Sequence, residues 1–209
     1  MEKEKILQIQ NKLIARFPDA HCELDFKTPY QLLVATILSA QCTDVRVNKV
    51  TDELFRVADT PEAILALGED TLREYIKTCG LGNSKAKNII SMSRDLVEKY
   101  NSEVPNDHAK LKALAGVGQK TANVVMSNAF DYPAFAVDTH VQRVSNRIGI
   151  AKSENVTGTE KQLMAAFDKN IWTRMHHTLI FHGRNICHAR KPDCENCPIE
   201  DLCEKNGMK

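Results

Sequence analysis

Apolar residues recur at intervals of three and four along most of the chain, which is the spacing of one face of an α-helix. The first such run is Ile6, Ile9, Leu13 and Phe17. Threonine, asparagine or aspartate stands before many of the later runs, in the place of a helix N-cap. These signals predict helices over residues 30–41, 61–67, 70–79, 85–100, 119–130, 139–148, 159–167 and 172–185, with others near residues 44 and 107. We therefore expect an all-α protein of about ten short helices.

Length and composition are those of a globular protein. The chain has 209 residues, of which 43% are hydrophobic and 26% charged, enough for a buried core in one or two small domains. No apolar run approaches the roughly 18 residues of a membrane span, and the mixed charges at the start are not those of a secretory signal. We expect a cytoplasmic protein, associated with the nucleoid if bacterial, with no membrane partner. The net charge of +1 does not indicate a nucleic-acid partner, so that inference depends on local motifs.

Four of the seven cysteines lie in the last 23 residues. They are Cys187, Cys194, Cys197 and Cys203, spaced Cys-x6-Cys-x2-Cys-x5-Cys. An odd total without a signal peptide argues against a disulfide framework. Four close thiols fit the ligation of either zinc or an iron–sulfur cluster, and the spacing alone does not decide between the two.

Residues 107–130 predict two helices joined by the turn Gly116-Val117-Gly118. Two glycines allow a tight turn whose N–H groups point outward, and at a helix N-terminus such donors can bind a phosphate. Lys120 lies in the first turn of the second helix, where the helix dipole disfavours an ammonium. Partial burial there would lower its pKa and supply the neutral amine that a lysine nucleophile requires. The structural alternative is a glycine turn between packed helices followed by a solvated lysine.

Several segments together resemble the endonuclease III branch of the helix-hairpin-helix DNA glycosylases. Besides the hairpin and the cysteine spacing, they are LSAQCTD (38–44), GLGNSKA (80–86) and VDTH (137–140). The resemblance covers nearly the whole chain. It implies a two-lobed helix-hairpin-helix glycosylase fold, with a six-helix lobe over residues 20–132. The second, helical lobe would combine residues 1–19 and 133–209 and hold the cysteine loop.

The same resemblance implies a function. It is that of a bifunctional DNA glycosylase and AP lyase of base excision repair, which removes oxidised pyrimidines from duplex DNA. Lys120 would attack C1′ of an everted nucleotide and form a Schiff base, and β-elimination would cut the strand 3′ to the abasic site. Asp138 would assist by proton transfer or by stabilising positive charge, although its place before a helix also fits an N-cap. The resemblance favours a [4Fe–4S] cluster over zinc, and we expect a monomer that binds double-stranded DNA containing damaged bases or abasic sites.

Further residues are expected to contact DNA. Gln41 and Leu81 would fill the gap that the everted nucleotide leaves and wedge beside its partner base. The other expected contacts are Lys85, Gly116, Val117, Gly118, His140, Arg143, Arg190 and Lys191. A helix-terminal amide, a core leucine and solvated helix faces are the structural alternatives.

Three positions depart from the family's pattern. Ala115, Gln119 and Gly82 stand where the family usually has a proline, a basic residue and an aromatic residue. We expect a less rigid hairpin, one phosphate contact fewer and a looser loop after Leu81.

Two other functions compete with this interpretation. An adenine-mispair glycosylase shares the fold and the cluster, but it usually lacks a lysine at the position of Lys120 and has a further domain after the cluster. We expect that domain to be missing, because six residues follow Cys203. A non-enzymatic DNA-binding module would use the hairpin and the cysteine loop for docking alone, and it would leave Lys120 and Asp138 unexplained.

Overall fold

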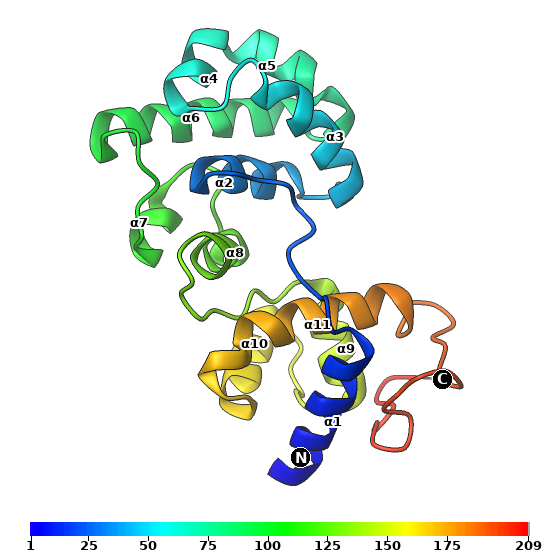
Figure 1. The fold of residues 1–209 in the computed structure, drawn as a ribbon. Coiled ribbons are helices and arrows are strands. Elements are labelled where there is room, and N and C mark those ends of the chain that lie inside the picture. Colours follow the sequence, from blue (N-terminus) through cyan, green and yellow to red (C-terminus); the bar gives the residue numbers. More distant parts are fainter. Residues whose placement is uncertain (209) are drawn as a thin grey trace. The chain divides into compact units, whose positions relative to one another are not determined.

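A computed structural model describes residues 1–208, and Figure 1 shows their helices. The α-helices are α1 Lys3–Arg16, α2 Pro29–Leu38, α3 Asp44–Phe55, α4 Pro61–Leu67, α5 Glu69–Ile76, α6 Gly82–Tyr100, α7 His108–Ala113, α8 Gln119–Ala129, α9 Thr139–Ile148, α10 Val156–Ala166 and α11 Trp172–Asn185, with 3-10 turns η1 Lys77–Cys79 and η2 Lys169–Ile171. These residues contain no strand, so the all-α prediction is confirmed. None of the helices within residues 1–208 has both the length and the apolar character needed to cross a bilayer.

Side-chain caps explain where many helices begin. Thr28, Thr43 and Thr60 each accept a hydrogen bond from a backbone N–H three residues later, as the sequence predicts. Helix α10 begins three residues earlier than predicted, because Asn155 is its N-cap and the Asn155 Oδ1 accepts a hydrogen bond from Gly158 N. The start of α6 differs because Leu81, in a left-handed conformation, precedes it without a side-chain cap.

The chain divides into two compact units. Unit 2 is the continuous segment Cys22–Tyr132, and unit 1 combines Met1–His21 with the described residues from Pro133 onward. We expected boundaries after residues 19 and 132, and the last residue of the expected second lobe, Lys209, lies outside the described residues.

Helix α2 is the centre of unit 2. Nine of its ten residues, Tyr30 to Leu38, are buried, as expected of a helix that is apolar on all sides. It packs against α3, α6 and α8 (Figure 1). Its few polar groups find partners inside the unit: the Tyr30 hydroxyl bonds Ser93 Oγ at 2.6 Å. Helices α6 and α8, which carry the candidate site residues of this unit, are therefore both packed on α2.

Unit 1 packs around α9 and α11, with α1 against α11 and α10 against α9. Its core includes Ile9, Leu13, Phe135, Val144 and Leu179, all with no more than 1% of their surface exposed. The cysteine loop follows α11 directly and is packed onto the same core. The loop therefore lies on a rigid support within unit 1.

Candidate functional site

The glycine hairpin of unit 2 lies between α7 and α8 as expected. Gly116 has a φ of +78°, and a Cβ there would lie 3.0 Å from Asn88 Cβ on α6. We expected Val117 to contact DNA, but only 7% of its surface is exposed and its N–H donates to the Leu114 carbonyl at 3.2 Å. Gly118 leads into α8. The buried valine thus fixes a turn whose two glycines remain exposed. Asn88 is a contact of this turn that sequence reasoning missed, since nothing local signals it.

Lys120 is the second residue of α8, immediately after this turn. Its side chain is exposed, so the partial burial considered from the sequence is not found. Burial raises the pKa of the Cys22 thiol in the same unit, and the charge of Lys120 acts against that rise. Lys120 thus lies at the N-terminal, positive end of the α8 dipole and is accessible to solvent.

The two residues expected to enter the DNA stack, Gln41 and Leu81, share an unusual backbone conformation. Their φ values are 55° and 52°, in the left-handed region that L side chains seldom adopt. Both side chains are exposed, and 55% of the Leu81 surface is accessible. Gly82 follows Leu81, and a Cβ there would meet nothing closer than the Lys77 Cα at 3.8 Å, so a larger residue would fit.

Lys85 corrects one expectation. We expected it to contact DNA, but only 3% of its surface is exposed. Its Nζ donates hydrogen bonds to the carbonyl oxygens of Leu38, Ala40 and Cys79 at 2.9, 2.7 and 2.7 Å. Burial lowers the pKa of Lys85, and the Cys79 and Cys42 thiols act in the opposite direction. An amine held this way cannot also bind a phosphate.

Asp138 of unit 1 is the N-cap of α9. Its Oδ1 accepts hydrogen bonds from the backbone N–H groups of His140 and Val141, both at 2.9 Å, so the structural role considered for it is present. One carboxylate oxygen is occupied by these bonds, and the residue remains half-buried. His140, in the first turn of the same helix, is also half-buried.

Arg143 lies on α9 and points toward the cysteine loop. Its Nη2 donates to the carbonyl oxygens of Gly183 and Cys187, both at 3.0 Å. We expected a DNA contact here, but these two bonds of the guanidinium hold the end of α11 and the first cysteine. Arg190 and Lys191, within the loop, are exposed as a phosphate contact would require.

Arg147, one turn further along α9, was not expected. Its Nη1 donates to Cys187 Sγ at 3.6 Å and to the His188 carbonyl at 2.6 Å, and its Nη2 donates to the Ala189 carbonyl at 2.9 Å. The only sequence signal is its spacing of four from Arg143, which places both arginines on one helix face. Two arginines of α9 therefore hold the start of the loop.

The four cysteines of the loop line one pocket, together with Ile148, Ile186 and Ile199 among others. Within residues 1–208 no three side chains of the ligating types converge as one metal ion would require. Four thiols that line one pocket are a ligand set that fits a four-cysteine metal centre. Burial raises the pKa of Cys197 to about 11 and also raises that of Cys203. The positive charge of bound iron would stabilise the deprotonated form of these thiols, which is the form that binds metal.

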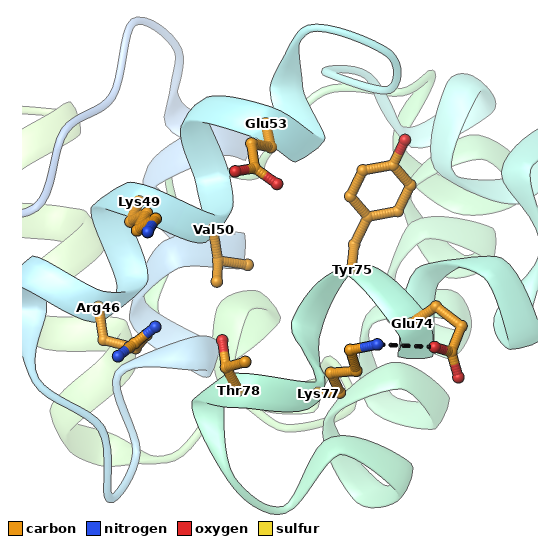
Figure 2. A pocket seen from close by; sticks show the side chains of 8 residues that line it. All are labelled: Arg46, Lys49, Val50, Glu53, Glu74, Tyr75, Lys77 and Thr78. Carbon is orange, nitrogen blue, oxygen red and sulfur yellow. Dashed lines mark hydrogen bonds and ion pairs between the residues drawn. The ribbon is translucent and has the colours of Figure 1, made fainter.

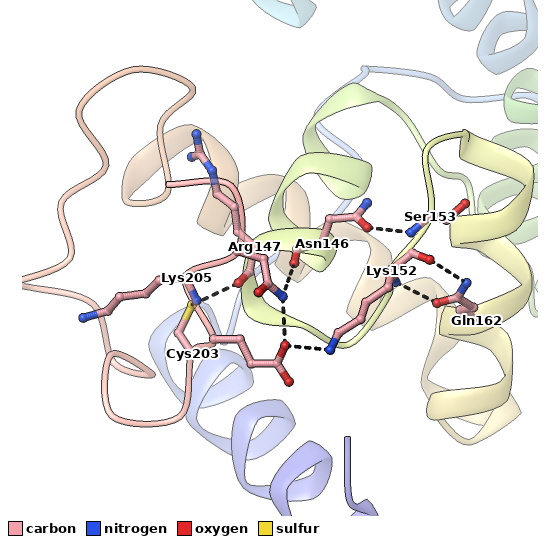
Figure 3. A network of polar contacts seen from close by, with 9 residues as sticks. Asn146, Arg147, Lys152, Ser153, Gln162, Cys203 and Lys205 are labelled. Carbon is pink, nitrogen blue, oxygen red and sulfur yellow. Dashed lines mark hydrogen bonds and ion pairs between the residues drawn. The ribbon is translucent and has the colours of Figure 1, made fainter. Parts of the chain in front are cut away.

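Polar contacts fasten the end of the loop to α9 (Figure 3). Cys203 Sγ lies 3.5 Å from the Arg147 carbonyl and accepts from Lys205 N at 3.4 Å. Asn206 Nδ2 donates to the Asn146 carbonyl at 3.2 Å. Lys152 pairs with Glu204 at 3.0 Å. The last cysteine is therefore fixed on both sides, as a ligand position must be.

A separate pocket of unit 2 lies between α3 and the α5–η1 segment (Figure 2). Its lining mixes three basic and two acidic side chains with Val50, Tyr75 and Thr78, and Lys77 and Glu74 form an ion pair at 3.2 Å. None of the expected site residues lines it. We assign it no part in the site.

Comparison with known proteins gives concordant results. Residues 34–171 match the HhH-GPD superfamily of base excision DNA repair proteins. Residues 187–203 match the iron–sulfur binding domain of endonuclease III. Endonuclease III of Haemophilus influenzae and that of Escherichia coli K12 are each 52% identical over 204 residues, covering 98% of this chain and 97% of theirs. The solved structure of a trapped endonuclease III–DNA covalent intermediate, an estranged-adenine complex, matches with a TM-score of 0.94 and 46% identity, covering 98% of this chain and 97% of that one.

These matches confirm the expected fold, the [4Fe–4S] cofactor and the activity class, a DNA glycosylase and AP lyase of base excision repair. The adenine-mispair glycosylase and the non-enzymatic module gain no support from them. The chain belongs to the endonuclease III family of the HhH-GPD superfamily.

Proposed function

We propose that this protein removes oxidised pyrimidines from duplex DNA and cuts the strand at the resulting abasic site through Lys120. The observation that carries the proposal is the placement of Lys120: an exposed amine in the first turn of α8, directly after the Gly116–Gly118 turn. That turn offers backbone N–H groups to a phosphate beside the amine. A lysine nucleophile needs this combination of access and a positioned sugar.

In the proposed reaction the Lys120 Nζ forms a bond to C1′ of the everted nucleotide, and the N-glycosidic bond breaks. The damaged base leaves with the bonding electron pair and takes up a proton. Opening of the sugar ring gives a Schiff base between Lys120 and C1′. Loss of a C2′ proton then expels the 3′ phosphate, which is β-elimination. No oxidant or reductant is consumed.

Asp138 is proposed as the second catalytic residue. Its Oδ1 is held by two backbone N–H groups at 2.9 Å, which fixes the orientation of the carboxylate. The second oxygen can then stabilise positive charge on the sugar or accept a proton. The cap and the catalytic role are compatible, because they use the carboxylate's several acceptor positions.

DNA binding is proposed for exposed groups on both units. Gln41 and Leu81 would fill the gap left by the everted nucleotide, and their exposed side chains on left-handed backbone support this role. Gly116 and Gly118 would bind phosphate through backbone N–H groups, and Arg190 and Lys191 would bind it through their charges. Val117 is not retained as a phosphate contact, because it is buried and its N–H donates to the Leu114 carbonyl at 3.2 Å. His140 is kept as a proposed contact, whereas Lys85 and Arg143 are assigned to structural contacts.

We further propose that Cys187, Cys194, Cys197 and Cys203 are the four ligands of the [4Fe–4S] cluster. When bound, the cluster cross-links the loop and has a structural role. Arg143 and Arg147 hold the loop's first residues, so that Arg190 and Lys191 face solvent. The proposal includes a monomer acting in the cytoplasm, on nucleoid DNA if bacterial.

The test is a panel of duplexes that contain thymine glycol, uracil, 8-oxoguanine or a preformed abasic site. We expect base release and strand cleavage at thymine glycol, cleavage at the abasic site, and little release of uracil or 8-oxoguanine. Release of uracil or 8-oxoguanine in preference to thymine glycol would contradict the proposed lesion class. Failure to cut the abasic site would contradict the lyase mechanism.

A further inference from the structure

The buried amine of Lys85 is fully satisfied by three backbone carbonyls. An ammonium has three N–H donors, and the three oxygens of Leu38, Ala40 and Cys79 lie 2.9, 2.7 and 2.7 Å from Nζ. A buried charge without such partners is strongly unfavourable. Because all three partners are main-chain atoms, the amine fixes the conformation of the backbone at these positions.

These carbonyls belong to two turns that are distant in sequence. Leu38 is the last residue of α2, and Ala40 lies in the turn that leads to Gln41. Cys79 ends η1, just before Gly80 and Leu81. A Cβ on Gly80 would lie 4.0 Å from the Gln41 carbonyl oxygen, which independently places the two turns side by side. Lys85 therefore joins the Gln41 turn to the Leu81 turn from a third element, α6.

In each turn the residue proposed to enter the DNA stack has a strained backbone conformation. Gln41 and Leu81 have φ values of 55° and 52°, and a left-handed conformation is unfavourable for an L residue because its Cβ approaches the following carbonyl oxygen. Such strain persists only where the surroundings enforce it, and it is concentrated at functional sites. The amine of Lys85 supplies the enforcing contacts. It binds the carbonyl of Ala40, which directly precedes Gln41, and the carbonyl of Cys79, which lies two residues before Leu81.

We propose that Lys85 is a positioning residue that holds the Gln41 and Leu81 turns in the conformation from which their side chains enter the DNA stack. The inference rests on the proposed function, in which both side chains act on duplex DNA. Without the amine, the turns relax toward ordinary backbone conformations, and Gln41 and Leu81 no longer project together. Nucleotide eversion is then impaired, whereas the chemistry of Lys120 on an already accessible sugar is retained.

The experiment compares Lys85→Met with Lys99→Met in the full-length protein with its cluster. Lys99 is an exposed lysine at the other end of α6, so its replacement removes the same charge from the same helix. Cleavage of an abasic site is measured under single-turnover conditions in a duplex and in the same strand alone. We expect Lys85→Met to slow duplex cleavage by about tenfold or more, to leave single-strand cleavage within about twofold, and Lys99→Met to change neither.

A second readout follows the stack itself. A 2-aminopurine opposite the abasic site brightens when it is unstacked. We expect that increase with the wild-type protein and Lys99→Met, and a reduced increase with Lys85→Met. In a Gln41→Ala, Leu81→Ala background, Lys85→Met should cause no further loss of duplex cleavage, because contacting residues that act as a unit are non-additive.

Equal losses on duplex and single strand would overturn the inference, as would a full Lys85→Met effect in the double-alanine background. If Lys85→Met does not fold, Lys85→Arg keeps the charge but presents a planar fork that cannot meet three converging carbonyls. A folded Lys85→Arg protein with an unchanged duplex-to-single-strand ratio would also overturn it. Failure of the proposed function is distinguishable, because the wild-type protein itself would then cleave neither substrate.

Discussion

Replacing Gly116 with alanine should destabilise unit 2, whereas the same change at Gly118 should not. At Gly116 the φ of +78° costs an alanine about 1–2 kcal/mol. The new Cβ would also lie 3.0 Å from Asn88 Cβ, so that α6 or the turn must shift. A smaller gain of about 0.4–1 kcal/mol comes from the restricted unfolded chain. We expect Gly116→Ala to lower the free energy of unfolding by about 2 kcal/mol.

Gly118 is the matched control two residues away. Its φ and ψ are −90° and −177°, and a Cβ there would meet nothing within 4 Å. Gly118→Ala should therefore leave stability unchanged or raise it by about 0.4–1 kcal/mol. The assay is urea unfolding of both cluster-containing proteins without oxygen, followed by circular dichroism. Equal stabilities of the two variants would refute the assignment of strain and close packing to Gly116.

Three further predictions concern unit 1. Burial lowers the pKa of His177 to about 4; between that value and about 6.5 only the unfolded state binds the proton, so stability falls as pH decreases through this window, by about 3 kcal/mol. Burial also lowers the pKa of His182 to about 4, so His177→Gln should reduce the slope of stability against pH in urea unfolding at pH 4.5 to 7.5 without abolishing it, and an unchanged slope would contradict the prediction. Arg147→Met should speed loss of the cluster's visible absorbance to a chelator several-fold relative to the exposed-site control Arg174→Met; equal rates would show that the Arg147 bonds do not hold the loop. Asp138→Asn should slow base release while keeping DNA affinity and stability. Asp138→Ala should slow base release and also lower the free energy of unfolding by about 1 kcal/mol, because the N-cap is lost. Normal base release by Asp138→Asn would show that Asp138 has no catalytic role.

Local signals predicted much of the helical structure. The predicted helix over residues 139–148 is found with the same limits, because its N-cap Asp138 and the following Gly149 are both nearest-neighbour signals. The start of α6 was predicted wrongly, since Leu81 in a left-handed conformation gives no local capping signal. Conformations enforced by distant contacts are beyond such rules.

Side-chain roles were harder to predict than helices. Lys85 follows an exposed loop and has the sequence appearance of a phosphate contact, yet three carbonyls from two distant turns bury it. Arg143 has the same appearance but holds carbonyls at the end of α11. In both cases the partner is a main-chain atom, and main-chain partners leave no trace in residue type or spacing.

Borohydride trapping on abasic-site DNA tests the central role of Lys120 most directly. Reduction converts a Schiff base into a stable amine, so the wild-type protein and the Lys99→Ala control should give a covalent complex, and mass spectrometry should locate the adduct on the peptide containing Lys120. Lys120→Ala should give none while still binding DNA. Normal trapping by Lys120→Ala, or an adduct on another residue of the wild-type protein, would contradict the account.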